Sequence, residues 1–169
     1  ISDTCGIGTL APGVLSGGKE VAIGVDGDLF HLLLEGDAAF LARQPPGGVM
    51  EDDWLSLGAG VNIRDLAVAA DHQLYVVREE FGGVSLGRVD PAAATPAITT
   101  IGPTLFEGGA PTSVAVSPSG EVYLGAGDGV YRSEPGTGVR IKVSSTTIVA
   151  QLLVRDEQHL LALTGDGLV

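Results

Sequence analysis

Histidines and carboxylates are the side chains of this 169-residue chain whose chemistry could support catalysis or metal binding. The three histidines, His31, His72 and His159, fall at different places relative to the repeated sequence pattern described below. Ligands of a zinc ion must converge on one point. These three histidines occupy non-equivalent positions of the repeat, so the repeat does not bring their side chains together. We therefore interpret them as surface or turn histidines, and we predict no metal ligand among them.

The carboxylates suit calcium better, because Ca²⁺ takes oxygen ligands. They gather at expected turns and are Asp26, Asp28, Glu51, Asp52, Asp53, Asp128 and Asp166. No segment has the spacing of an EF-hand loop, and aspartate is common in turns because its side chain accepts hydrogen bonds from nearby N–H groups. We therefore favour turn chemistry, expect no cofactor, and keep calcium as an alternative.

The remaining motifs do not indicate a reaction. The glycines of Gly6–Ala11 and Gly58–Gly60 lack the strand-to-helix context of a dinucleotide fingerprint. The sequence contains no GxSxG, GKS/GKT or HExxH, so the serine hydrolase, P-loop and zincin interpretations have no anchor residues. Trp54 could stack on a sugar, but packing between sheets is the favoured interpretation. We assign no catalytic, cofactor-binding or metal-binding residue.

Charge and cysteine content exclude some partners. Nine basic and 21 acidic residues give a net charge of −12, which disfavours binding to nucleic acid or to anionic membranes. No apolar stretch approaches the roughly 18 residues of a membrane span, so we expect no membrane insertion. Cys5 is the single cysteine, which prevents a disulfide within the chain. We expect a structural or incidental role for it.

A twelve-residue block that occurs four times is the strongest structural signal. Its positions 1 to 3 and 9 to 10 are apolar in every copy. The copies span residues 21–32, 66–77, 114–125 and 152–163. Because repeats at such spacing are typical of solenoids and propellers, the block predicts a repeat architecture.

Within each block two short strands flank a turn, at Asp26-Gly27, Asp71-His72, Ser119-Gly120 and Glu157-Gln158. Asp-Gly favours a type I′ hairpin turn. A second turn follows in each copy, and later segments supply a third and a fourth strand, for example Trp54–Leu57, Ala97–Ile101 and Val139–Val143. The inner strands are predicted at Val21–Val25, Leu66–Ala70, Val114–Ser117 and Leu152–Arg155.

This pattern predicts an all-β chain, a β-propeller of about four blades with four antiparallel strands each and an incomplete last blade. A β-sandwich is the alternative. We expect a single propeller domain or fragment over residues 1–169, with an N-terminal strand segment at 1–20. Its predicted repeat units are 21–65, 66–112, 113–150 and 151–169.

Two segments also carry a family resemblance. Residues 114–125 resemble the repeat core of NHL-type propellers, and residues 127–133 resemble a segment of BNR-like and sensor-type propellers. The resemblance implies the fold and transfers no catalytic residue. The Arg-Ile-Pro motif and Asp-boxes of sialidases are absent from this sequence.

If a site exists, propeller geometry places it on the loops that lead from outer to inner strands, here Gly58–Asp65, Leu105–Thr112 and Ser144–Val149. Their charged residues are Arg64, Asp65 and Glu107. The first functional hypothesis is a non-enzymatic module that binds a protein or glycan, or further blades of the same or a companion chain. The alternative is part of a propeller enzyme, a glycoside hydrolase or lyase, or a ligand sensor, with active residues elsewhere.

The compartment and the extent of the chain are further expectations. The chain begins with Ile1, which fits signal cleavage and an extracellular or periplasmic location. One cysteine is compatible with either redox compartment, so a cytoplasmic location stays open. The fourth copy stops after its third turn, and we expect the ring to continue in further sequence.

Overall fold

The structure is a computed structural model that describes residues 21–24, 26–35, 38–80, 83–102, 110–134, 137–146 and 148–169. The expected N-terminal strand segment at 1–20, with Cys5, lies outside the described residues, and so does Glu107. None of the described residues belongs to a helix long and apolar enough to cross a membrane.

Each of the first two sheets has four antiparallel strands, hydrogen-bonded in chain order. The first sheet contains β1 (Val21–Ile23), β2 (Leu29–Glu35), β3 (Ala38–Gln44) and β4 (Glu51–Ala59). The second contains β5 (Asn62–Val68), β6 (Leu74–Glu80), β7 (Gly83–Val89) and β8 (Thr99–Ile101). The block therefore supplies the first and second strands of each sheet, as predicted.

The third and fourth sheets continue the pattern, and the described part of the fourth has three strands. The third sheet contains β9 (Ser113–Val116), β10 (Val122–Ala126), β11 (Gly129–Ser133) and β12 (Arg140–Ser144). The fourth contains β13 (Val149–Asp156), β14 (His159–Thr164) and β15 (Gly167–Leu168). The prediction of four blades with an incomplete last blade is confirmed, and the β-sandwich alternative is wrong.

The first turn of each blade differs from the predicted type I′ geometry in three copies. Gly27 N–H donates to the Gly24 carbonyl, and Gly24 N–H donates to the Asp28 carbonyl. Gly27 has a positive φ of 90°, and Asp26 before it does not, so this turn lacks the two successive positive φ values of type I′. His72 (67°) and Gly120 (89°) end equivalent loops. This is the geometry of a type I turn followed by a left-handed residue.

Alternate positions of the block pack in opposite directions. In the first blade Ala22, Phe30 and Leu32, at positions 2, 10 and 12, share a core cluster with residues of the second sheet. Those partners stand at positions 1, 9 and 11 of the second block and are Leu66, Leu74 and Val76. Even positions therefore face the following sheet, and odd positions face the preceding one.

The same rule holds at the next two junctions. Tyr75 and Val77 share a cluster with positions 1, 9 and 11 of the third block, Val114, Val122 and Leu124. Ala115 and Tyr123 pack with Leu152, Leu160 and Ala162. Fully burying a leucine or valine stabilises a fold by about 1.5–3 kcal/mol, so these clusters fix the spacing between neighbouring sheets.

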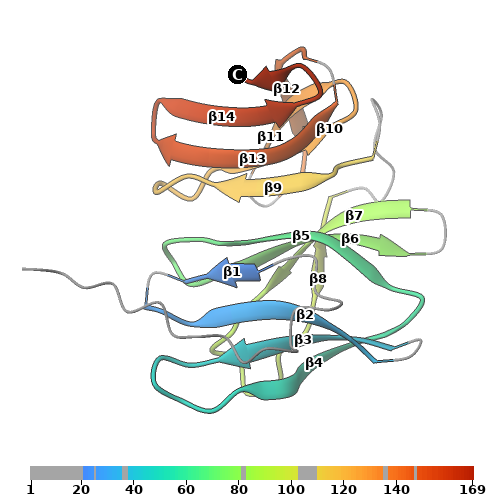
Figure 1. Cartoon of the computed structure of the whole chain (residues 1–169), viewed down its shortest axis with the longest axis vertical. Helices are drawn as coiled ribbons and strands as arrows, with labels where there is room; N and C mark the ends of the chain where they lie inside the picture. Colours follow the sequence, from blue (N-terminus) through green and yellow to red (C-terminus); the bar gives the residue numbers. More distant parts are fainter. Residues whose placement is uncertain are drawn as a thin grey trace, which may run out of the picture.

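The sheets form an open arc. Strand β1 contacts β5, β5 contacts β9, and β9 contacts β13, so the first strands of the blades lie side by side. Figure 1 shows the first sheet and the fourth sheet at opposite ends of the molecule. On strand β12 the apolar side chains of Ile141 and Val143 are both exposed.

Candidate functional site

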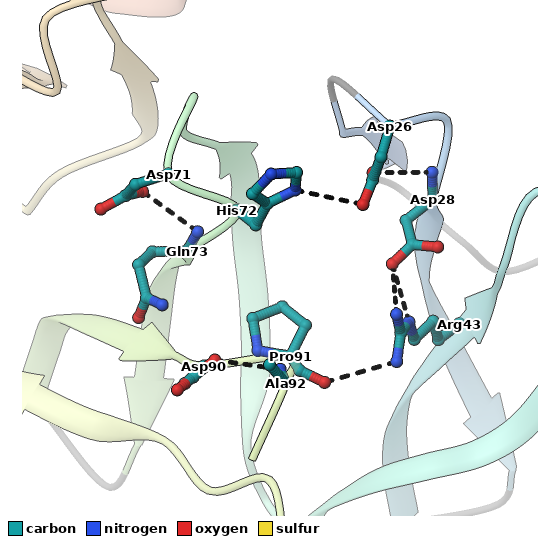
Figure 2. Close-up of polar contacts among 9 residues, drawn as sticks. All are labelled: Asp26, Asp28, Arg43, Asp71, His72, Gln73, Asp90, Pro91 and Ala92. Atoms are coloured by element: carbon teal, nitrogen blue, oxygen red, sulfur yellow. Dashed lines mark hydrogen bonds and ion pairs between the residues drawn. The ribbon is translucent and has the colours of Figure 1, made fainter.

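The most connected polar cluster joins the first and second blades at their first turns (Figure 2). Asp28, which follows the first turn, is almost fully buried. Arg43 on β3 binds its carboxylate through Nε at 2.9 Å and Nη2 at 2.5 Å. Its Nη1 donates to the Pro91 carbonyl of the second blade at 3.3 Å. Both bonds to Asp28 end on the same oxygen, Oδ2, and the guanidinium balances the negative charge of this buried carboxylate.

Aromatic rings surround the same guanidinium. Its Cζ lies 6.0 Å from the ring centroid of Phe30 and 5.9 Å from that of Trp54. The two rings are 5.4 Å apart and tilted. Trp54 is only partly buried and packs against the core cluster between the first two sheets. The packing interpretation of Trp54 is therefore confirmed, and the cluster ties blades together.

Turn side chains add two more bridges between blades at this end. Nδ1 of His72 lies 3.1 Å from Oδ2 of Asp26, which joins the second turn to the first (Figure 2). Ser119 donates to the Glu157 carboxylate at 2.8 Å, which joins the third turn to the fourth. A backbone hydrogen bond from Asp28 lowers the pKa of the Asp26 carboxyl, and His72 lowers it further. The predicted turn role of Asp26 is confirmed.

The opposite end of the inner strands holds Arg64, one of the predicted site residues. The guanidinium pairs with Glu79 on β6, with Nε to Oε2 at 3.1 Å and Nη2 to Oε1 at 3.1 Å. Nη1 also donates to the Pro111 carbonyl, just before β9, at 3.3 Å. The side chain of Arg64 is 27% exposed. A guanidinium held at three points and open to solvent is a fixed cation at this end.

Asp65, the next residue, is buried and has a structural role. Its Oδ2 accepts a hydrogen bond of 2.7 Å from the Val114 N–H of the third blade, and its Oδ1 accepts one of 2.8 Å from the Leu66 N–H. Arg64 and Asp65 therefore both bridge the second and third blades, and only Arg64 stays accessible.

The three predicted site loops are shorter than expected. Most of Gly58–Asp65 belongs to strands, since β4 ends at Ala59 and β5 begins at Asn62. Of Leu105–Thr112, only residues 110–112 are described. Ser144 ends β12 and Val149 begins β13. Strand β5 begins at Asn62, four residues before the block that predicted it, and Arg64 lies at a shift in register between Ile63 and Asp65.

The three histidines lie apart in the sequence repeat and have separate environments. His31 is buried on β2, where desolvation lowers the pKa of its imidazole, and the Asp52 carboxylate raises it in part. His72 is the turn residue bound to Asp26. His159 begins β14 and lies 2.7 Å from Asp156. Among the described residues, none of these imidazoles lies in a group of three or more His, Cys, Asp or Glu side chains that could hold a metal ion.

The other acidic residues occupy ordinary surface positions. Asp128 accepts hydrogen bonds from Lys142 at 2.7 Å and from Tyr131 at 2.8 Å. The hydrogen bond from Lys142 lowers the pKa of the Asp128 carboxyl, and the one from Tyr131 lowers it further. Glu51, Asp52 and Asp53 are exposed on β4, and the Asp166 N–H donates to Thr164. Within the described ranges, no three His, Cys, Asp or Glu side chains could hold a metal ion.

A cavity of about 180 Å³ lies between the second and third blades, near the turn at Gly120. Tyr75 and Arg88 line one wall, and Ser133 and Glu134 line the other. Ligand pockets usually enclose about 300–1,000 Å³, so this cavity suits only a small molecule.

Sequence reasoning missed Arg43, although a signal existed. Arg43 and Arg88 both stand 22 residues after the start of their blocks. Each pairs across the strands with the aromatic residue at block position 10, Arg43 with Phe30 and Arg88 with Tyr75. The recurrence of arginine opposite an aromatic ring could have indicated a cation–π contact.

No protein-family model and no curated protein matches this sequence. Solved structures do match. A gluconolactonase from Xanthomonas campestris is 16% identical with a TM-score of 0.71, and the match covers 89% of this chain and 55% of that one.

Two further structures give the same picture. A putative gluconolactonase is 17% identical with a TM-score of 0.71, over 89% of this chain and 56% of that chain. A streptogramin B lyase is 15% identical with a TM-score of 0.59, over 91% and 54%. The chain thus spans little more than half the length of these proteins. Because the chain is similar in structure to these proteins and forms four successive antiparallel sheets, it has the fold of a partial β-propeller.

Proposed function

We propose that this chain forms part of a propeller enzyme, a hydrolase or lyase that acts on a small molecule with a reactive carbonyl group. The observation that carries the proposal is the Arg64 guanidinium, held by Glu79 and the Pro111 carbonyl and still 27% exposed. It lies at the end of the blades where the inner strands begin. The solved structures with this fold include proteins named as gluconolactonases and a lyase, which favours an enzyme over a passive module.

In this proposal Arg64 binds the carbonyl oxygen of the substrate. A fixed guanidinium stabilises negative charge that develops on an oxygen, and it costs no reorganisation during the reaction. Glu79 orients the cation through two contacts of 3.1 Å. Because this carboxylate is paired with arginine, its role is positioning and not proton transfer.

The test is hydrolysis of a panel of sugar lactones, aryl esters and cyclic ester peptides, followed by pH-stat against the spontaneous rate, with and without added divalent cations. Arg64→Ala should abolish any rate above background, and Arg64→Lys should keep part of it. Arg132→Ala is the matched control, because Arg132 forms an exposed pair with Glu121 at the same 3.1 Å distance at the other end of the strands. A panel without turnover by the unaltered chain, or equal rates for both alanine variants, contradicts the proposal.

A non-enzymatic binding module is the second candidate. The exposed apolar side chains of Val139, Ile141 and Val143, along the outer strand of the third blade, favour contact with a protein over contact with a glycan. A glycan array distinguishes the two partner classes. Binding to a glycan without turnover would support a module of the glycan type and count against the enzyme.

A further inference from the structure

An arginine stands opposite the aromatic residue of block position 10 in each of the first three blades. The cross-strand pairs are Arg43 with Phe30, Arg88 with Tyr75, and Arg132 with Tyr123. In the first and third blades, block position 8 gives this arginine a carboxylate, since Asp28 pairs with Arg43 and Glu121 pairs with Arg132. The second blade has the neutral Gln73 at that position. No carboxylate of the described residues forms an ion pair with Arg88.

The same arginine lines the cavity of about 180 Å³ between the second and third blades. At the first junction the ring of Trp54 covers the equivalent guanidinium, with its centroid 5.9 Å from Cζ of Arg43. At the second junction the small Thr99 of β8 stands opposite Arg88. The carboxylate and the indole ring that enclose Arg43 are thus replaced by an amide and a threonine, and a cavity lies beside Arg88. Its lining residues all belong to the second and third blades, so it does not depend on what precedes or follows this sequence.

The two walls of the cavity carry opposite charges. Arg88 and Tyr75 lie on the wall of the second blade, and Glu134 lies on the wall of the third. Burial raises the pKa of the Tyr75 hydroxyl, Asp71 raises it further, and the charge of Arg88 lowers it in part, so the hydroxyl stays protonated and can donate a hydrogen bond. Asp71 itself caps its own turn, where it accepts the Gln73 N–H at 3.1 Å (Figure 2). The guanidinium of Arg88 and the carboxylate of Glu134 therefore stay available to a ligand between the walls.

Apolar side chains and a small volume complete the description of the cavity. Leu86, Ile101 and Val122 line it together with the polar groups. A cavity of about 150 Å³ in another protein holds a benzene molecule. A volume of about 180 Å³ therefore accommodates roughly six to eight non-hydrogen atoms, which is the size range from alanine to valine.

We infer that this cavity binds a small aliphatic α-amino acid in its zwitterionic form. Arg88 binds the carboxylate of the ligand, because a guanidinium fork matches the two oxygens of a carboxylate, and Tyr75 donates to the same group. Glu134 accepts hydrogen bonds from the ammonium group, and the aliphatic side chain packs on the apolar lining.

The zwitterion fits the charges better than a simple ion does. A carboxylic acid without an amino group would place its negative charge beside Glu134, in a chain whose net charge is already −12. An amine without a carboxylate would place a positive charge beside Arg88. The inference goes beyond the proposed function and does not depend on it, because the cavity lies near the first turns and Arg64 lies at the other end of the inner strands.

The experiment is a titration of the isotope-labelled 169-residue chain with L-valine, followed by nuclear magnetic resonance. The backbone amides of Gly120, Ser133 and Glu134, which line the cavity, should shift and saturate, and that of Gly165 in the fourth blade should not. L-valinamide lacks the carboxylate, and 3-methylbutanoate lacks the ammonium group. Each should bind at least about tenfold more weakly than L-valine, since each loses a charge-assisted contact.

Two variants test the charges while the shape of the cavity is kept. Gln73→Asp gives Arg88 the kind of partner that Arg43 has in the first blade, so the dissociation constant of L-valine should rise at least about tenfold. Gln73→Asn is the matched control, because it has the same size and no charge, and it should bind L-valine as the unaltered chain does. Glu134→Gln should weaken the binding of L-valine and strengthen that of 3-methylbutanoate, because it removes the negative charge from one wall.

Three results would overturn the inference. L-valine could fail to shift the amides that line the cavity up to its limit of solubility. L-valine and 3-methylbutanoate could bind equally well, which indicates an anion site without a place for the ammonium group. Gln73→Asp and Gln73→Asn could bind L-valine equally well, which shows that the charge of Arg88 is not used. If the amide spectrum of Gln73→Asp shows an unfolded chain, Glu134→Gln and the two analogues decide the question. Absence of lactone hydrolysis in the same samples counts against the proposed function alone.

Discussion

The side chain of Asp65 and the backbone N–H of Val114 are joined by a hydrogen bond of 2.7 Å that crosses from the second blade to the third. The carboxylate is buried and also accepts the Leu66 N–H. Inner strands of neighbouring blades do not hydrogen-bond to each other as a sheet. This single carboxylate therefore satisfies backbone donors at the start of two adjacent inner strands.

Asp65→Ala is expected to lower the free energy of unfolding by about 2–4 kcal/mol, because two buried N–H donors lose their acceptor. Asp65→Asn keeps one acceptor oxygen and should cost less. Urea unfolding followed by circular dichroism measures both. Asp53→Ala, at an exposed position of β4, is the control and should change stability by less than about 0.5 kcal/mol. Equal stabilities for Asp65→Ala and the control would contradict the structural role.

Arg43→Lys tests the cluster of Figure 2. Lysine cannot reproduce the two contacts with Asp28, nor the planar cation beside the rings of Phe30 and Trp54. We expect a loss of about 1–3 kcal/mol in the free energy of unfolding, since a charge-assisted contact to a buried carboxylate is weakened.

Trp54 is the only tryptophan of the chain, so its fluorescence reports directly on this cluster. Arg43→Lys should shift the emission of the folded protein, and Arg132→Lys should not, because Arg132 pairs with Glu121 in the third blade. An unchanged emission spectrum together with unchanged stability would show that the cluster tolerates any cation.

The sequence predicted the four sheets because the apolar positions of the block point to both neighbouring blades at once. The same pattern could not distinguish a two-residue turn from the observed three-residue loop, since Asp-Gly and Ser-Gly suit both geometries. Only the backbone bonds from Gly27 to Gly24 and from Gly24 to Asp28 decide between them.

The polar contacts were less predictable, for a physical reason. Asp28 and Arg43 are 15 residues apart, and the third partner of the cluster, the Pro91 carbonyl, lies after β7 in the second blade. Periodicity determines which face of a strand a residue occupies, but the reach and direction of a long side chain depend on its neighbours in space. Arg64 was expected in a loop but lies on β5, and its pairing with Glu79 was not predicted.

His31 predicts a dependence of stability on pH. Burial lowers the pKa of its imidazole below the usual value of about 6.5. Between the folded pKa and about 6.5, the unfolded chain binds more protons than the folded one, so the free energy of unfolding falls as the pH falls through this range. The loss is absent only well above about pH 6.5, where the imidazole is neutral in both the folded and the unfolded state.

Urea unfolding between about pH 7.5 and pH 5 measures the slope of the free energy of unfolding against pH. His31→Gln should flatten this slope. His159→Gln, at an exposed position beside Asp156, should leave the part of the slope that comes from His31 unchanged. The Asp26, Asp128 and Asp156 carboxyls have lowered pKa values and titrate below this window. A slope that persists in His31→Gln would assign it to another group.

Gly125 interrupts the block at position 12, where the other copies have Leu32, Val77 and Leu163. A Cβ atom at Gly125 would lie 2.5 Å from Oγ of Ser113 and 2.6 Å from Cγ1 of Val149. The fully buried Val149 of the fourth blade thus fills the volume that a side chain at position 12 occupies at the other junctions.

Gly125→Ala should therefore lower the free energy of unfolding by about 1–3 kcal/mol, the usual cost of overpacking a close-packed interior. Gly165→Ala is the matched control, because nothing lies within 4 Å of its added Cβ. A glycine-to-alanine change without strain restricts the unfolded chain, so this control should be neutral or slightly stabilising. The double variant Gly125→Ala, Val149→Ala should be less destabilised than the two single changes added together, because the smaller side chain makes room for the new methyl group. Strict additivity in urea unfolding would show that Val149 does not occupy the space that Gly125 leaves.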